Sequence, residues 1–344
     1  MTTSTMPDGR PKINVSDPGQ LIASIPYLFG FRPENSLVVA GLGGSSGGRL
    51  GPVLRLALPP PEHEEEAVAA VMPAFAHNPC GAVIAIVVGA HPGRAPGELP
   101  HARLIARLSA AFEELGRPLL NTLWTPEVRG GARWRSYEGD REGELPDQRS
   151  TELAAICVSQ GQVTYDSREE MAGRLAPDDP AAIARRAALL REQSREPMTF
   201  AAGLAEVRRA LLLVRNGDLA FGDDQVVRLA EALSNSRVRD TCLATAHGSV
   251  AGRPTQAEGL WLELIRRTPP PERAEAASVL GYAAYLRGDG AFARVALENA
   301  LDADPGHMLS RLLVRCLERG IPPEKLRELG SNEHLDRLLP PAGR

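Results

Sequence analysis

The stretch Ala82-Val83-Ile84-Ala85-Ile86-Val87-Val88 decides the fold of the first half of this chain. Its continuous run of apolar, mostly β-branched side chains is typical of a strand that is buried on both faces. An amphipathic helix is predicted at Leu99–Leu115 and a second strand at Leu119–Thr125. This order of strand, helix and strand predicts a sheet that is at least partly parallel, with helices covering its faces.

Segments on either side of this unit add further strands. Ser36–Leu42 and Val53–Leu58 are short β-rich runs, and the glycine-rich connector Gly43–Gly48 predicts that they are antiparallel neighbours. Gly130-Gly131 predicts a second hairpin, which adds a strand at Arg133–Tyr137. We therefore expect a mixed sheet of five or six strands.

Strand signals end before Asp178, and only helical patterns follow. The predicted helices of this part are Pro180–Gln193, Phe200–Arg215, Asp224–Leu233, Ser236–Ala246 and Glu258–Arg267. A chain of 344 residues is about twice the usual size of one domain. We predict an α/β domain at residues 16–175 and an all-α domain at residues 178–329.

One segment of the all-α part, Ala274–His307, matches the tetratricopeptide pattern of about 34 residues. Leu280-Gly281 fall on its central Leu-Gly, Gly288 on its turn and Ala293 on its small helix-crossing position. Neighbouring windows match poorly, so the prediction is a single tetratricopeptide-like hairpin. It could form a peptide-binding groove, or it could be a helical pair packed inside a larger helical domain, and we favour the second.

Composition excludes several classes of protein. The chain is 43% hydrophobic and 24% charged, which is near the globular average. Its net charge is −4 and its arginines are dispersed, so we expect no nucleic-acid binding. No apolar run is long enough for a bilayer, no secretory signal precedes the first helix, and the cysteines have no paired spacing. We therefore expect a soluble cytoplasmic protein without membrane contact.

The chain resembles the actinobacterial Domain of Unknown Function 4192 family from about Ser16 to Leu329. The motifs that carry the resemblance are Ile25-Pro26-Tyr27-Leu28-Phe29-Gly30-Phe31-Arg32-Pro33-Glu34-Asn35-Ser36-Leu37-Val38-Val39, Trp134-Arg135-Ser136-Tyr137, Ser167-Arg168-Glu169-Glu170, and Gly288-Asp289-Gly290 with Asp304-Pro305-Gly306-His307. The resemblance implies a lineage but no activity. Two positions depart from it, because relatives tend to carry an aspartate where Ala57 stands and several have a cysteine cluster at Glu138–Gly143.

Known catalytic and cofactor motifs do not account for the chain. The stretch Gly41–Gly48 is followed by Arg49 and a strand, whereas a phosphate-binding loop needs a helix or Lys-Ser/Thr at that place. The histidines of the α/β half lack the spacing of metal ligands, and no serine lies in G-x-S-x-G. These histidines are His63, His77, His91 and His101. We expect no metal site and no cofactor.

The best remaining candidates are polar residues near the predicted strands. They are Arg32, Asn35, Ser36, Arg55, Arg135, Ser136, Tyr137 and Arg168. Arginines on a mostly apolar sheet could bind an anionic ligand through bidentate hydrogen bonds. Alternatively, they could form ordinary ion pairs and tie the first segment to the sheet.

The function itself is not revealed by the sequence. We prefer a non-catalytic intracellular binding or interaction protein with an unknown protein partner, because no catalytic motif is present. The alternative is an uncharacterised enzyme or a sensor of a small anionic ligand that uses the α/β domain. Arginines that converge on one pocket would favour this alternative, whereas scattered arginines would favour the binding protein.

Overall fold

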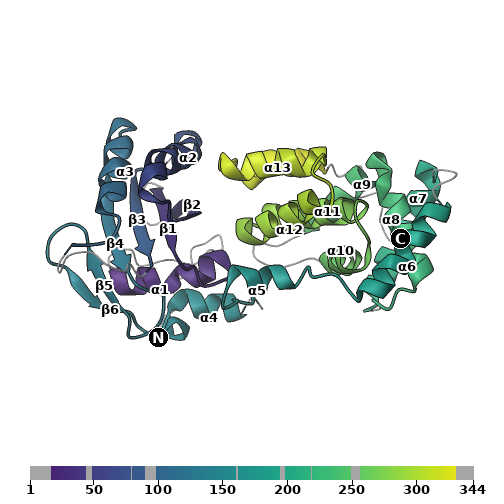
Figure 1. The fold of residues 1–344 in the computed structure, drawn as a ribbon, viewed down its shortest axis with the longest axis horizontal. Helices are drawn as coiled ribbons and strands as arrows, with labels where there is room; N and C mark the ends of the chain where they lie inside the picture. The colour runs from purple at the N-terminus through teal and green to yellow at the C-terminus, as the bar shows by residue number, and fades with distance from the viewer. Residues whose placement is uncertain are drawn as a thin grey trace, which may run out of the picture. The chain divides into compact units, whose positions relative to one another are not determined.

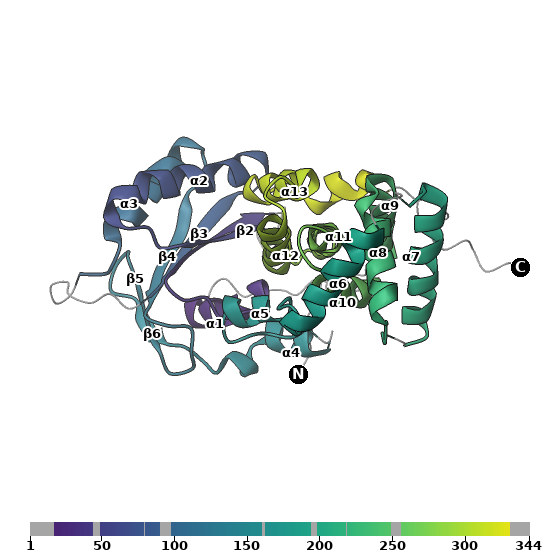
Figure 2. The ribbon, with the colours of Figure 1, turned by 45° about the vertical axis from the view of Figure 1, so that its right-hand side comes forward.

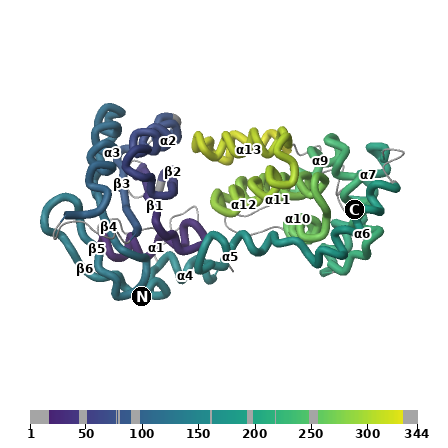
Figure 3. Tube along the Cα trace, viewed as in Figure 1, coloured from purple at the N-terminus to yellow at the C-terminus, as the bar shows by residue number. Residues whose placement is uncertain are grey.

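The computed structural model describes residues 17–43, 49–78, 80–89, 98–159, 162–193, 198–217, 219–248 and 256–330. Figure 1 labels the helices and strands, and Figure 3 follows the same chain from purple to yellow. The chain divides into two compact units. The first unit is Met1–Arg168 with Glu318–Ile321, and the second is Glu169–Leu317 with Pro322–Arg344.

The first unit is built on a six-stranded mixed sheet in the order β2-β1-β3-β4-β5-β6. Its strands are β1 (Ser36–Gly43), β2 (Arg49–Ala57), β3 (Ala82–Val88), β4 (Leu119–Thr125), β5 (Arg133–Ser136) and β6 (Glu142–Glu144). β3 and β4 are parallel, and β1 is antiparallel to both β2 and β3. The predicted mixed and partly parallel sheet and its first hairpin are therefore confirmed; residues 44–48 of that hairpin lie outside the described part.

Helices cover both faces of this sheet. Its helices are α1 (Pro18–Phe29), α2 (Glu64–His77), α3 (Ala102–Glu114) and α4 (Glu152–Ser159). Figure 2 shows α2 and α3 on one side of the strands and α1 with α4 on the other. On the first side, alternate residues of β1 and β3 pack against Phe75 of α2 and Phe112 of α3. On the other side, Ile84, Ile86 and Val88 are equally buried, as expected for a strand with two apolar faces.

The strand β6 is not among the strands that the sequence predicts. Its sequence, Glu-Gly-Glu, has no apolar alternation and therefore gives no strand signal. The strand forms because Gly143 lies under the Trp134 side chain of β5. A Cβ at Gly143 would be 2.9 Å from Trp134 Nε1, so only glycine allows this close approach.

The second unit is helical. Its α-helices are α6 (Pro180–Gln193), α7 (Phe200–Arg215), α8 (Asp223–Ser234), α9 (Ser236–Cys242), α10 (Gln256–Arg267), α11 (Arg273–Leu286), α12 (Gly290–Ala303) and α13 (Met308–Glu318), and α5 (Arg168–Gly173) precedes them. Every residue of α11 from Ala276 to Leu286 is buried. Across the described ranges, no helix combines the length and apolarity that crossing a membrane requires.

The pair α11 and α12 has the closest packing of this unit. A Cβ at Gly281 of α11 would lie 2.7 Å from Cγ of Leu297 on α12. Ala293, which lies one turn before Leu297 on α12, has 0% exposure. Gly288 has a positive φ of 88° and connects the two helices, which is a backbone conformation that glycine adopts readily. Small residues therefore set the distance between α11 and α12.

We expect Gly281→Ala and Ala293→Arg each to destabilise the protein by about 1–3 kcal/mol, because both positions lack room for added atoms. Ala291→Arg is the control, since Ala291 is half-buried at the start of α12 and should cost about 0.5 kcal/mol. The measurement is the urea midpoint of each full-length variant. Equal midpoints for Ala293→Arg and Ala291→Arg would contradict this packing.

Candidate functional site

Four of the eight candidate residues lie at or beside the start of β1, namely Arg32, Asn35, Ser36 and Arg55. Arg55 of β2 donates from Nε to Ser36 Oγ at 2.8 Å, and Ser36 Oγ in turn donates to the Glu34 carbonyl at 2.6 Å. The Arg55 guanidinium also lies 5.6 Å from the centre of the Phe31 ring, within cation–π range. We call Phe31, Arg32, Ser36 and Arg55 the Arg32–Arg55 cluster.

A backbone bridge brings a later segment to this cluster. The Arg32 amide donates to the Tyr165 carbonyl at 3.0 Å, and the Tyr165 amide donates to the Gly30 carbonyl at 2.8 Å. Arg32 forms an ion pair with Asp166 at 2.9 Å, but its Nε is buried without a hydrogen-bond partner among the described residues. Arg168 begins α5 two residues after Asp166 and is half-buried. Three arginines therefore come from segments that meet beside Phe31.

Asn35 lies at the end of the sheet where β3 and β4 finish. Its φ is 42°, and its Oδ1 would be 3.1 Å from a Cβ placed on Gly89, directly after β3. Ser36 is paired with Val88 in the sheet register. Asn35 therefore packs against the backbone at the carboxyl end of β3, where a side chain at position 89 would have to displace it slightly.

The other three candidates, Arg135, Ser136 and Tyr137, lie elsewhere. β5 is three strand spacings from β1, about 15 Å. Arg135 Nε lies 3.9 Å from Glu142 on β6, and Ser136 Oγ donates to the Thr122 carbonyl at 3.3 Å. The Tyr137 hydroxyl donates to the Pro100 carbonyl. The structure therefore splits the predicted constellation into two groups.

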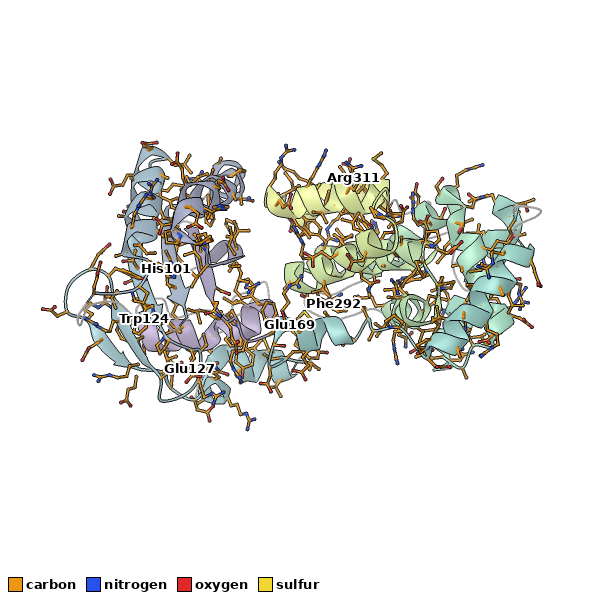
Figure 4. All side chains as sticks on the ribbon, in the orientation of Figure 1. His101, Trp124, Glu127, Glu169, Phe292 and Arg311 are labelled. Carbon is orange, nitrogen blue, oxygen red and sulfur yellow. The ribbon has the colours of Figure 1, made fainter. Side chains whose placement is uncertain are left out.

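Trp124, which is not among the predicted candidates, and Tyr137, which is, hold the two described ends of the connection between β3 and α3. Trp124 of β4 donates from Nε1 to the Gly89 carbonyl at 3.0 Å, at the start of that connection. Tyr137 binds its other end, at Pro100, and His101 follows with a φ of 57°. Figure 4 labels His101 and Trp124. No sequence pattern reveals this anchoring, because Trp124 also fits an ordinary half-buried strand position.

A polar network of the helical unit surrounds His307. The Ser310 amide and hydroxyl lie 3.3 Å and 2.8 Å from His307 Nδ1. Glu275 Oε2 of α11 lies 3.0 Å from His307 Nε2 and accepts from Arg239 of α9 at 3.0 Å. A backbone amide can only donate, so Nδ1 is the acceptor and Nε2 carries the proton that is donated to Glu275.

This Ser, His and Glu arrangement is structural and not a hydrolase site. Ser310 has 0% exposure, so no substrate can reach its hydroxyl. The Ser310 amide and hydroxyl share one acceptor, which is how a side chain caps a helix N-terminus. Burial lowers the pKa of Arg239, but the charges of Glu275 and Asp240 outweigh it and raise the pKa overall. The network therefore fixes the start of α13 to α9 and α11.

The outer side of α13 is exposed. Of its apolar residues only Leu313 is buried, while Met308 is 74% and Leu312 is 47% exposed. Arg311 and Arg315 are also exposed, and neither guanidinium has a partner among the described residues. These four positions follow i, i+3, i+4 and i+7 and share one side of the helix. We call Met308, Arg311, Leu312 and Arg315 the α13 face.

The histidines and cysteines are the residues that metal or thiol chemistry would use. Within the described ranges, no three His, Cys, Asp or Glu side chains are grouped to hold a metal ion. His91 and the side chain of His77 lie outside those ranges. Burial raises the pKa of Cys157 to about 11 and also raises that of Cys242, which makes both thiols unreactive. Cys316 is half-buried, although the apolar residues beside it in the sequence suggest a fully buried thiol.

Removing the His307 cap tests the network. We expect His307→Ala to destabilise the protein by about 1–2 kcal/mol, because the Ser310 amide loses its acceptor and Glu275 keeps only Arg239 as a donor. His307→Asn should cost less, since its Oδ1 can still accept from the Ser310 amide. The measurement is the urea midpoint of each variant. An asparagine variant as unstable as the alanine variant would contradict a capping role.

Comparison with known proteins identifies a family. No curated protein matches the chain. No solved structure matches it either. A family model described as Domain of unknown function (DUF4192) matches residues 18–324, which include the sheet, the Arg32–Arg55 cluster and α13. The resemblance found in the sequence motifs is thereby confirmed, and the chain belongs to the DUF4192 family.

Proposed function

We propose that this chain is a cytoplasmic, non-catalytic binding protein of actinobacterial origin that engages a protein partner. The observation that carries this proposal is that most of the candidate polar side chains interact with other groups of the same chain. Ser36 and Arg55 bind each other and the Glu34 carbonyl, Arg135 lies near Glu142, and Tyr137 binds the Pro100 carbonyl. These interactions stabilise the sheet and its connections, and they assemble no group of acid, base and nucleophile.

We also propose an α/β domain at residues 16–175 and an all-α domain at residues 178–329, with α11 and α12 as a single tetratricopeptide-like unit. The close approach at Gly281 and the buried Ala293 support this assignment. A peptide groove needs an open helical face, but α11 is buried from Ala276 to Leu286. The hairpin therefore serves as a packed scaffold, and partner binding falls to other surfaces.

Affinity purification under mild conditions from the organism that encodes the chain tests the binding function. We expect one protein to be retained in near-stoichiometric amount at physiological salt. Arg191→Glu, on the exposed last turn of α6, should retain the same protein. If the purified chain carries no retained protein and instead turns over a metabolite pool, the proposal of a non-catalytic binding protein is wrong.

A second candidate function is the recognition of a small anionic ligand at the Arg32–Arg55 cluster. The specific observation is the buried Nε of Arg32, which has no partner among the described residues. Arg55 and Arg168 lie on segments that meet at the same place, while the acid paired with Arg32, Asp166, is 82% exposed. A phosphate or carboxylate could accept from the Arg32 guanidinium, as such groups do elsewhere.

Anion-dependent thermal stability tests this second candidate. We expect phosphate or a dicarboxylate to raise the melting temperature of the wild-type chain and to have a smaller effect on Arg32→Lys. Lysine keeps the positive charge but lacks Nε and the bidentate geometry. Asp166→Asn is the matched control, because it removes the competing carboxylate and should leave the anion effect equal or larger. Equal shifts in wild type and Arg32→Lys would exclude the site.

A further inference from the structure

We propose that the α13 face binds an acidic amphipathic helix of a partner protein. This inference rests on the proposed binding function and names the class of partner. The α13 face combines two adjacent rows, an apolar row of Met308 and Leu312 and a basic row of Arg311 and Arg315. Arg311 is labelled on α13 in Figure 4.

The apolar row supplies the first reason for a docking surface. Met308 and Leu312 are one turn apart, about 6 Å along the helix axis. The exposed fraction is 74% for Met308 and 47% for Leu312. Single exposed apolar residues are common, but two on one turn of one helix form a continuous strip. Methionine and leucine side chains adapt to an opposing helix, which presents its own residues with the same repeat.

The basic row decides the chemistry of the partner. Elsewhere in the helical unit many arginines are paired, for example Arg186 with Asp223 at 2.7 Å and Arg294 with Glu298 at 2.7 Å. The guanidinium groups of Arg311 and Arg315 have no such partner in the described part of the chain. A partner with acids beside its apolar row would neutralise them, and one with basic residues would be repelled.

The helix itself is rigidly held for this role. Ser310 and Leu313 are buried on the opposite side of α13 from the exposed rows. The His307 network fixes the first turn to α9 and α11, so the α13 face is preorganised. A preorganised surface loses less conformational entropy when it binds.

Binding of two synthetic peptides to the full-length chain tests the proposal. Each peptide has about 20 residues, long enough for measurable helicity, with leucines repeating at i, i+4 and i+7. One carries glutamates beside the leucines and its twin carries lysines. We expect the acidic peptide to bind, with an affinity that falls as salt is raised, and the lysine twin not to bind.

Charge reversal supplies the decisive variant. Arg311→Glu with Arg315→Glu should weaken binding of the acidic peptide about tenfold or more and should allow the lysine twin to bind. An acid at position 311 suits the dipole of the first turns of α13, whereas an acid at position 315 in the last turn opposes it, so the urea midpoint of the double variant checks that it folds. Arg191→Glu is the control for net charge and should change the affinity by less than about twofold.

Equal binding of the acidic peptide to wild type and the double variant, no binding of either peptide, or binding only to vesicles rich in phosphatidylglycerol would each overturn the proposal. The last would make the α13 face a membrane contact. A partner from the affinity purification that the double variant still retains would leave the binding function intact and exclude this surface. If that purification retains no partner while the peptides bind as expected, the proposed function as a binding protein is contradicted instead.

Discussion

The need to exclude water from both faces of β3 organises the α/β unit. The side chains of Val83 to Val88 point alternately to the two faces of the sheet and are all buried. Each face therefore needs a layer of helices, and each edge of β3 needs a neighbouring strand. The parallel pairing with β4 forces a crossover, which becomes α3, and α2 occupies the space beside it. Both edges of the sheet are then protected: β2 carries Pro52, and β6 is short and acidic. The candidate polar residues are consequences of this arrangement, since they lie where strands end and connections must be tied down.

The helical unit also has to exclude water from its centre, and it does so by the close approach of α11 and α12. α11 is buried on all sides, which is possible only because Gly281 and Ala293 let α12 come near enough to exclude water. A central helix of this kind cannot also line an open groove. In this unit α11 is therefore the packed central helix, whereas α13 is an outer helix of which little is buried. Buried polar contacts at His307 hold α13 where apolar contacts are few.

The sequence predicts the parts of the fold that depend on local periodicity. The bounds of β3, β4, α6 and α7 agree with prediction because each has a strong apolar pattern and clear terminal residues. β6 was missed because the side chains of Glu-Gly-Glu carry no strand pattern: the segment pairs through its backbone, and Gly143 lies against the Trp134 ring. The candidate site was harder, since Arg32 and Ser36 are near each other in sequence whereas their neighbours Tyr165 and Asp166 come from a distant segment. The polar network of Arg239, Glu275 and His307 likewise joins three helices that no sequence spacing relates.

The two possible binding regions differ in how their charges are balanced, and this difference decides which kind of ligand each suits. At the Arg32–Arg55 cluster, Arg55 is held by Ser36 and the Phe31 ring, so a ligand must be small and must reach Arg32. On the α13 face, the arginines stand beside exposed apolar side chains, so a ligand must offer acids and apolar groups together. A small anion satisfies the first requirement and cannot satisfy the second, because it has no apolar surface to bury. A folded helix satisfies the second because its side chains repeat with the same spacing as those of α13.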